Sequence, residues 1–315
     1  MKQAGLIGGA RKVLGDIYQN RLSMAGLVLS AFFVLLAVLY SILGTRMVPY
    51  NPYRLDLSAA NLPPSMQHIF GTDALGRDIF SRIIAAMPID MAMPAGIVLF
   101  SLLIGILLGS IAGYFRGAAE EVIMRLTDLF LAFPSIIMAL AIAATLGPSI
   151  PHAMLSVMIV WWPPYVRLAR GSVLEVTAQD FVTASKAMDL SFPYILRHDI
   201  LPNILPTMIV YATMDFGTAL LTISTLGFLG VGIPVGTPEL GLMASSLTTT
   251  LYTYPWEGLI PAAFIFLIVL GFGLLGEGLR DALDVNLRPH IIRRVPRKAD
   301  EDRPLVLIKD TGQSN

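Results

Sequence analysis

Cysteine is absent from this chain of 315 residues, which excludes disulfide bonds, thiolate nucleophiles and cysteine-ligated metals. Charged residues make up only 14% of the chain, whereas they make up about 25% of a typical soluble domain. The formal net charge is zero, so charge alone indicates no nucleic-acid or acidic partner. Hydrophobic residues account for 55% of the sequence, and the mean hydropathy is +0.69. The composition therefore predicts an integral membrane protein.

Catalytic motifs are also missing. The chain has no G-x-x-x-x-G-K-[ST] stretch, so it has no phosphate-binding loop and is not expected to hydrolyse ATP. The four histidines are scattered, and we expect no metal site and no cofactor bound by this chain. The sequence offers no convincing nucleophile and base for an intramembrane enzyme.

Apolar stretches of the length that crosses a bilayer as a helix recur along the sequence. The fourth is the shortest and contains Pro163 and Pro164, although Trp161 and Trp162 suit a membrane interface. The sequence predicts an all-α membrane protein with about six transmembrane helices. They are expected over residues 24–44, 91–114, 123–147, 153–169, 204–232 and 257–279.

Basic residues sort to one side of these spans. If the N-terminus is cytoplasmic, only Arg46, Arg54, Arg77 and Arg82 of the 22 Lys and Arg residues fall on the outer side. Because Lys and Arg accumulate in cytoplasmic segments, both termini are predicted to be cytoplasmic.

Three regions follow from this orientation. We expect a cytoplasmic segment at 1–23, a transmembrane domain at 24–287 and a flexible, charged cytoplasmic tail at 288–315. Inside the transmembrane domain, residues 45–90 form an outer amphipathic segment, and the polar stretch 181–203 lies on the cytoplasmic side between the fourth and fifth spans.

The polar stretch FVTASKAMDLSFPYILRHDILPN (181–203) has the pattern of two short helices. Phe181, Ala184, Ser185 and Met188 share one small, mostly apolar helical face. Asp189 then breaks the pattern, and aspartate tolerates left-handed backbone better than most residues. Such a pair of helices could be gripped by another protein; an ordinary solvated loop is the alternative.

The second short helix has its own start and stop signals. Ser191 is a candidate N-cap, and Pro193 fits the first helical turn. Pro202 disfavours helical geometry just before it, so the helix is expected to end near Leu201. Asn203 is then the expected N-cap of the fifth span.

This stretch resembles the segment by which permeases of ABC importers contact their ATPases, a Glu-Ala-Ala, then Gly, then His-x-Leu-Pro-Asn pattern. The family's Glu-Ala-Ala falls on Thr183, Ala184 and Ser185, with a threonine in place of the acid. Its glycine falls on Asp189. The resemblance assigns ATPase coupling to Thr183, Ala184, Ser185, Ala187, Met188, Asp189, His198, Leu201, Pro202 and Asn203.

The resemblance extends over nearly the whole chain, to permeases of the oligopeptide and dipeptide subfamily. It is carried by FGTDALGRDIFSRI (70–83), GYFRG (113–117), RLTDLFLAFPS (125–135), GFLGVG (227–232) and GEGLRDALD (276–284). The family implies a multi-pass protein of the cell membrane, a second permease that is usually a different chain, two cytoplasmic ATPases that bind ATP and Mg²⁺, and an external substrate-binding protein. Peptides are the family's usual substrate, while relatives carry oligosaccharides or nickel.

The outer stretch 70–83 predicts an amphipathic surface helix. Asp78 and Arg82 are spaced for an i, i+4 ion pair, and Leu75, Ile79 and Ile83 form a stripe. Packing against the second permease or the binding protein, through Asp73, Arg77 and Asp78, is one interpretation. A structural re-entry into the second span is the other.

Asp215 is the one acid far inside a predicted span. Because an aspartate at the centre of a membrane helix costs about 2.5–3.5 kcal/mol, it should face a cavity or a partner. It either lines the translocation path or forms a hydrogen bond to a neighbouring helix, for instance to Thr213 or to the other subunit. An ion-coupled secondary transporter using Asp215 is the rival function, although the two halves show no internal repeat.

Overall fold

The computed structural model describes residue 18 and residues 20–283. The regular secondary structure of these residues is helical. Within these residues the only β pairing is an isolated bridge between Thr72 and Asp78. The predicted all-α class is therefore confirmed. The tail at 288–315 and nearly all of the segment 1–23 lie outside the described residues.

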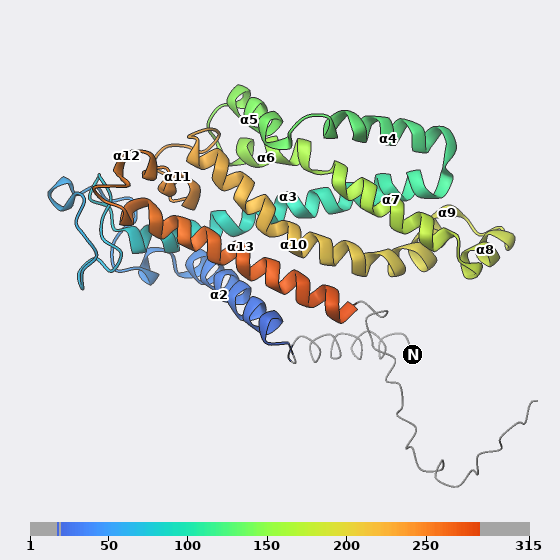
Figure 1. Ribbon diagram of the computed structural model, residues 1–315, viewed down its shortest axis with the longest axis horizontal. Helices are drawn as coiled ribbons and strands as arrows, with labels where there is room; N and C mark the ends of the chain where they lie inside the picture. The colour runs from blue at the N-terminus through green and yellow to red at the C-terminus, as the bar shows by residue number, and fades with distance from the viewer. Residues whose placement is uncertain (1–17, 19, 284–315) are drawn as a thin grey trace, which may run out of the picture. The chain divides into compact units, whose positions relative to one another are not determined.

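Four helices are long and apolar enough to cross a membrane. They are α2 (Arg21–Leu43), α3 (Ile79–Phe115), α10 (Leu201–Phe228), which continues a helical stretch from Phe192, and α13 (Trp256–Leu283). They run side by side along the molecule in Figure 1. These four correspond to the predicted first, second, fifth and sixth spans.

The predicted third and fourth spans are each broken into two helices. A bend of 81° separates α4 (Gly117–Leu131) from α5 (Ser135–Leu146), with Pro134 at the break. Trp162 separates α6 (Ile150–Trp161) from α7 (Pro163–Thr177), which begins with two prolines. By length and composition the described residues hold four spans, or five if the bent α4–α5 pair counts as one. The number six thus stays a prediction.

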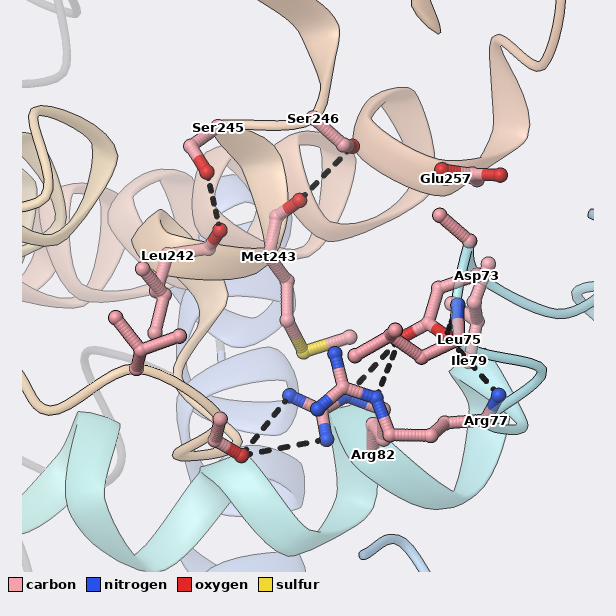
Figure 2. Close-up of a pocket in the computed structure, with 13 residues that line it drawn as sticks. Asp73, Leu75, Arg77, Ile79, Arg82, Leu242, Met243, Ser245, Ser246 and Glu257 are labelled. Atoms are coloured by element: carbon pink, nitrogen blue, oxygen red, sulfur yellow. Dashed lines mark hydrogen bonds and ion pairs between the residues drawn. The ribbon is translucent and has the colours of Figure 1, made fainter. Parts of the chain in front are cut away.

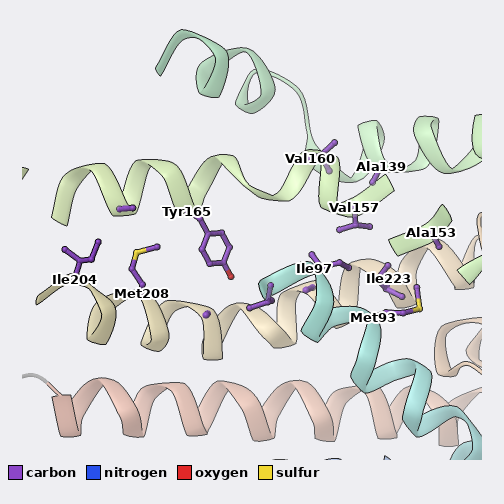
Figure 3. Packing of buried hydrophobic residues seen from close by; sticks show 14 of the residues in the cluster. Met93, Ile97, Ala139, Ala153, Val157, Val160, Tyr165, Ile204, Met208 and Ile223 are labelled. Carbon is purple, nitrogen blue, oxygen red and sulfur yellow. The ribbon is translucent and has the colours of Figure 1, made fainter. Parts of the chain in front are cut away.

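Close packing of α3 on α7 organises one half of the core. Gly105, Gly109 and Gly113 of α3 face α7, and a Cβ at Gly105 would lie only 2.3 Å from the Cβ of Tyr165. Next to this seam, Tyr165 of α7 and Met208 of α10 project into the same buried cluster, which Figure 3 shows. A second cluster, around Phe33, Met87 and Phe216, joins α2, α3, α10 and α13.

The outer stretch 70–83 is not a surface helix as predicted. Residues 70–78 form turns, and α3 begins only at Ile79. Asp78 is its N-cap: its Oδ2 accepts hydrogen bonds from the backbone N–H and hydroxyl of Ser81, at 2.8 and 2.7 Å. A capping carboxylate is committed to the helix end, so it does not pair with Arg82. The structure shows the re-entry into the second span instead.

Two short helices, α11 (Leu240–Ala244) and α12 (Leu247–Thr250), lie between α10 and α13 and were not predicted. In Figure 1 they lie at the end of the bundle that also holds the turns between α2 and α3. The helices α8 (Asp180–Ala187) and α9 (Phe192–Ile195) lie at the opposite end. The two polar regions of the sequence are thus separated by the length of the bundle.

Candidate functional site: the coupling segment and two buried polar clusters

The stretch predicted to be the coupling segment, residues 181–203, forms the two short helices that the sequence predicts. The bend between α8 and α9 falls on Asp189, whose φ of 56° is left-handed. Ser191 is the N-cap residue of α9 with extended backbone, although its side chain makes no capping hydrogen bond, and Pro193 lies in the first turn. The bend and the start of the second helix are therefore confirmed.

The two faces of α8 differ in exposure. Val182 and Ser185 are buried against the bundle, Ser185 with only 7% of its surface exposed. Thr183, Ala184 and Ala187 are exposed, and so is Met188 just beyond the helix, at 65%. The predicted contact face therefore loses Ser185, which packs inward.

Aromatic contacts fix the segment to the end of α3. The ring of Phe192 lies 4.7 Å from that of Tyr114 and 4.8 Å from that of Phe115, measured between centroids. The Lys186 ammonium lies 4.7 Å from the centroid of Tyr114, a cation–π contact. These contacts connect α8 and α9 to the last turn of α3.

The exit from the segment differs from the prediction. Residues Leu196–Ile200 form one π-helical turn, and the chain continues into α10 without interruption. Asn203 is inside the helix and donates to the carbonyl of Asp199, so it is not an N-cap. Pro202 is tolerated because it follows the π turn, where the hydrogen-bond register shifts and its missing N–H removes little.

His198 and Leu201 belong to this continuous helical stretch. The His198 ring stacks on Tyr194 with 4.2 Å between centroids, and its Nδ1 lies 2.9 Å from the Tyr194 carbonyl oxygen. Leu201 is partly buried in the core cluster. Both residues therefore stabilise the conformation of the segment. Of the two, only His198 is exposed.

Asp215 of α10 is held by two donors that flank the break between α6 and α7. Trp161 Nε1 and Tyr165 OH both donate to Asp215 Oδ2, each at 2.7 Å. The structure thus shows the predicted alternative, a hydrogen bond from a neighbouring helix, although Thr213, named as an example, donates to the carbonyl of Ile209. The other carboxylate oxygen of Asp215, Oδ1, has no hydrogen-bond partner among the described residues. Asp215 is thus anchored on one side only.

The outer residues Asp73, Arg77 and Asp78 lie close together but serve different contacts. Asp73 Oδ2 accepts from Arg77 Nε at 2.8 Å, and Arg82 Nε lies 3.8 Å from the same oxygen. Asp78 Oδ1 lies 2.9 Å from His68 Nδ1. All three predicted residues therefore stabilise the turns that lead into α3.

A pair of buried acids was missed. Asp90 of α3 and Glu239, the N-cap residue of α11, are both fully buried, and both carboxylates accept from the N-terminal backbone of α11. Glu239 accepts from the backbone N–H of Gly241 and Leu242 at 2.9 and 2.6 Å, and Asp90 from that of Leu240 at 3.2 Å. Burial raises the pKa of Glu239 to about 7.

The sequence did not indicate this pair, because the predicted second span begins at residue 91 and leaves Asp90 just outside it. Glu239, directly before Leu240 and Gly241, could have indicated the start of α11, since acidic residues cap helix N-termini. Among the described residues, no three His, Asp or Glu side chains gather as a metal site. The buried acids Asp90 and Glu239 connect α3 to the start of α11.

Comparison with known proteins gives these features a common explanation. Residues 105–289 match the family model of the binding-protein-dependent transport system inner membrane component. Residues 11–64 match the N-terminal TM domain of oligopeptide transport permease C. The chain belongs to this family of permeases. It is the membrane subunit of an ABC importer and not an enzyme.

Curated relatives cover nearly the full chain. The dipeptide transport system permease protein DppC of Alkalihalophilus pseudofirmus is 39% identical over 88% of this chain and 90% of its own length. The probable D,D-dipeptide transport system permease protein DdpC of Escherichia coli is 40% identical over 82% and 86%. The glutathione transport system permease protein GsiD of Escherichia coli is 38% identical over 82% and 86%.

The fold also has a solved counterpart. A chain of the MetNI methionine ABC transporter, in an inward-facing conformation, aligns with a TM-score of 0.52. The alignment covers 65% of this chain and 97% of that chain, at 19% sequence identity. This likeness supports the permease fold alone.

Proposed function

We propose that this permease forms half of the translocation path of an importer for dipeptides or similarly small peptides. The names of the relatives support this substrate class, because they include dipeptide, D,D-dipeptide and glutathione permeases. The other half of the path is a second, homologous permease. ATP and Mg²⁺ bind to two partner ATPases, and an external binding protein delivers the peptide.

In this proposal the protein lies in the cytoplasmic membrane with both termini in the cytoplasm. The distribution of Lys and Arg supports this orientation. The coupling segment then faces the ATPases, and the turns between α2 and α3 face the binding protein. Asp73, Arg77 and Asp78 would act there by shaping the surface on which a partner rests.

The exposed face of α8 is the observation that carries the coupling proposal. Thr183, Ala184 and Ala187 present small side chains, and Phe181 and Met188 add exposed apolar surface, at 46% and 65%. Small residues let another protein approach the backbone, while exposed apolar side chains favour its binding. Movement of the ATPases would shift α8 and α9 and, through them, α3 and α10.

The absence of cysteine makes a direct test of this contact possible. Ala184→Cys and Ala187→Cys would each place a single thiol on the exposed face, and Ser185→Cys a thiol on the buried face of the same helix. With a photoactivatable maleimide attached, we expect the first two to crosslink to an ATPase subunit in membranes, with a yield that changes on adding ATP.

The buried control distinguishes a specific contact of the exposed α8 face from nonspecific crosslinking. Ser185→Cys should react poorly and give little crosslink. Equal crosslinking from all three positions, or none from Ala184 and Ala187, would overturn the proposed contact.

We further propose that Asp215 lines the path and meets polar or cationic groups of the peptide. Its free Oδ1 supports this role, and the two hydrogen bonds to Oδ2 would stabilise a charge at this depth. Asp215→Asn keeps an acceptor for Trp161 and Tyr165 but removes the charge. A lost charge-assisted contact of about 1.5–3 kcal/mol corresponds to about ten- to hundredfold slower uptake at low peptide concentration.

Uptake of labelled dipeptide into proteoliposomes measures this effect. Asp215→Ala is the structural comparison, because it leaves two donors unpaired and should lower thermal stability as well. Normal uptake by a well-assembled Asp215→Asn variant would show that the carboxylate serves packing only.

A further inference from the structure

A small cavity lies at the end of the bundle opposite the coupling segment. It has a volume of about 270 Å³ and is bounded by residues 73–82, by the stretch 235–246 and by the start of α13. Figure 2 shows its charged side chains, Asp73, Arg77, Arg82 and Glu257. Sites for drug-sized ligands measure about 300–1,000 Å³. This cavity therefore suits a smaller molecule, of the size of an amino acid or a dipeptide.

One wall of the cavity carries an excess positive charge. Arg77 and Arg82 share the single carboxylate of Asp73, at 2.8 and 3.8 Å from its Oδ2. Figure 2 shows the two arginine side chains close together beside Met243. Two guanidinium groups around one carboxylate leave a net charge of about +1 on this wall.

The two arginines differ in their remaining contacts. Arg82 is only 2% exposed, and its terminal nitrogens donate to the carbonyls of Pro52, Gly236 and Thr237. The terminal nitrogens of Arg77 have no hydrogen-bond partner among the described residues. Arg77 also lines a neighbouring, wider cavity of about 650 Å³, so an approaching molecule can reach it. A carboxylate would find two free donors there in a planar, bidentate arrangement.

The opposite charge comes from α13. Glu257 lines the same cavity, is 3% exposed, and its Oε1 is buried without a hydrogen-bond partner. Within residues 20–283 neither of its carboxylate oxygens takes part in an ion pair. A buried carboxylate without a partner is costly, and such groups in native proteins call for an explanation such as a missing ligand.

We propose that this cavity is a binding site for a small zwitterion, an amino acid or a dipeptide. The carboxylate of the ligand binds the terminal nitrogens of Arg77, and its ammonium group pairs with Glu257. The inference rests on the proposed function only in its choice of a dipeptide as one probe. The charges of the two walls themselves call for a ligand with one positive and one negative end.

Direct binding tests the site without transport. The importer complex, isolated through this chain in lipid nanodiscs without binding protein or ATP, is titrated with alanyl-alanine or with alanine and followed by saturation-transfer NMR. We expect saturable binding of both probes. Glu257→Gln removes one charge-assisted contact and should weaken alanyl-alanine binding about tenfold or more.

Half-ligands separate the two walls. N-acetyl-alanyl-alanine lacks the ammonium group, so it should bind the wild type and Glu257→Gln equally, and Arg77→Gln more weakly. Arg54→Gln, an exposed arginine on the same outer segment, is the matched control and should change nothing. Because Glu257 has no hydrogen bond to lose, its replacement by glutamine is not expected to disturb folding.

The binding and uptake results test the zwitterion site and the proposed dipeptide substrate separately. No saturable binding of either probe, or equal binding by Glu257→Gln and the wild type, would overturn this site and leave peptide import to the uptake assay. Alanine binding that depends on Arg77 and Glu257, in a complex that imports no dipeptide, would keep the site and overturn the proposed substrate.

Discussion

At the scale of single residues, polar groups in the apolar bundle serve as connections between helices. Asp215 joins α10 to both sides of the α6–α7 break, and Asp90 joins α3 to α11 through the backbone N–H of Leu240. A charge in an apolar surrounding is stabilised only when donors surround it, so each buried acid specifies one arrangement of its helices.

The Asp90–Glu239 pair predicts a pH-dependent stability. Because the folded-state pKa of Glu239 is raised from its ordinary value of 4.5 to about 7, the folded protein holds a proton that the unfolded chain releases. This contribution to stability is fully present below about pH 4.5 and is lost as the pH rises through 7. We expect the thermal unfolding temperature of the purified complex to fall between pH 5 and 8 by this route.

Glu239→Gln should weaken that dependence. Glutamine does not titrate, but its amide replaces the oxygen that accepts from Leu242, at a cost of about 1 kcal/mol. The variant should therefore be less stable than the wild type at pH 5, and the difference should shrink or reverse by pH 8. Parallel stability curves for the two proteins would contradict the assignment.

One predicted ion pair was wrong, as was the predicted N-cap Asn203. The i, i+4 spacing of Asp78 and Arg82 predicted a pair, but that rule describes residues inside a helix. Because α3 begins at Ile79, Asp78 lies outside the helix, where the free N–H groups and His68 compete for it. The sequence pattern cannot show which competitor wins when one of them arrives from a separate turn.

At the scale of helices, hydropathy located the long apolar elements and missed their breaks. The predicted bounds 24–44 and 257–279 lie within a few residues of α2 and α13. Hydropathy averages over a window, so it reads α4 and α5 as one span although Pro134 turns the chain by 81°. Likewise, it cannot show the π turn, which depends on hydrogen-bond register and not on composition.

The glycine seam between α3 and α7 gives a prediction at this scale. A Cβ at Gly109 would lie 2.6 Å from the Cβ of Ala169 and 2.8 Å from the carbonyl oxygen of Val166. Gly109→Ala should therefore force the helices apart and destabilise the protein by about 1–3 kcal/mol. Thermal unfolding of the purified complex, followed by intrinsic fluorescence, measures this loss.

Gly171 of α7 provides the opposite case. Apart from its chain neighbours and the nearby backbone of its own helix, no atom of the described residues lies within 4 Å of a Cβ built there. Gly171→Ala should gain up to about 1 kcal/mol, because alanine favours the helix more than glycine does. Equal effects of the two substitutions would show that helix propensity, and not the close approach of α3 and α7, decides stability at the seam.

At the scale of the whole molecule, the coupling segment is connected to the opposite end by two helices. Residues 192–228 form one continuous helical stretch that leads from α9 to the neighbourhood of α11. The aromatic contacts of Phe192 join the same segment to the last turn of α3, and the first turn of α3 lines the charged outer cavity. The helices α8 and α9 are therefore connected, through α3 and α10, to the opposite end of the bundle.

This arrangement predicts that Phe192→Ala separates ATP hydrolysis from transport. The exposed face of α8 is unchanged in the variant, so the ATPases should still bind, while the contact with Tyr114 and Phe115 is lost. Aromatic pairs contribute about 0.5–1.5 kcal/mol beyond their buried area, so the peptide imported per ATP should fall about two- to tenfold. Reconstituted proteoliposomes give both rates, ATP hydrolysis and peptide uptake, in one preparation.

Phe100→Ala, which removes a ring on the exposed side of α3, is the matched control and should leave the ratio of imported peptide to hydrolysed ATP unchanged. If Phe192→Ala lowered hydrolysis and uptake in proportion, Phe192 would belong to the ATPase contact itself and the route through α3 would be wrong.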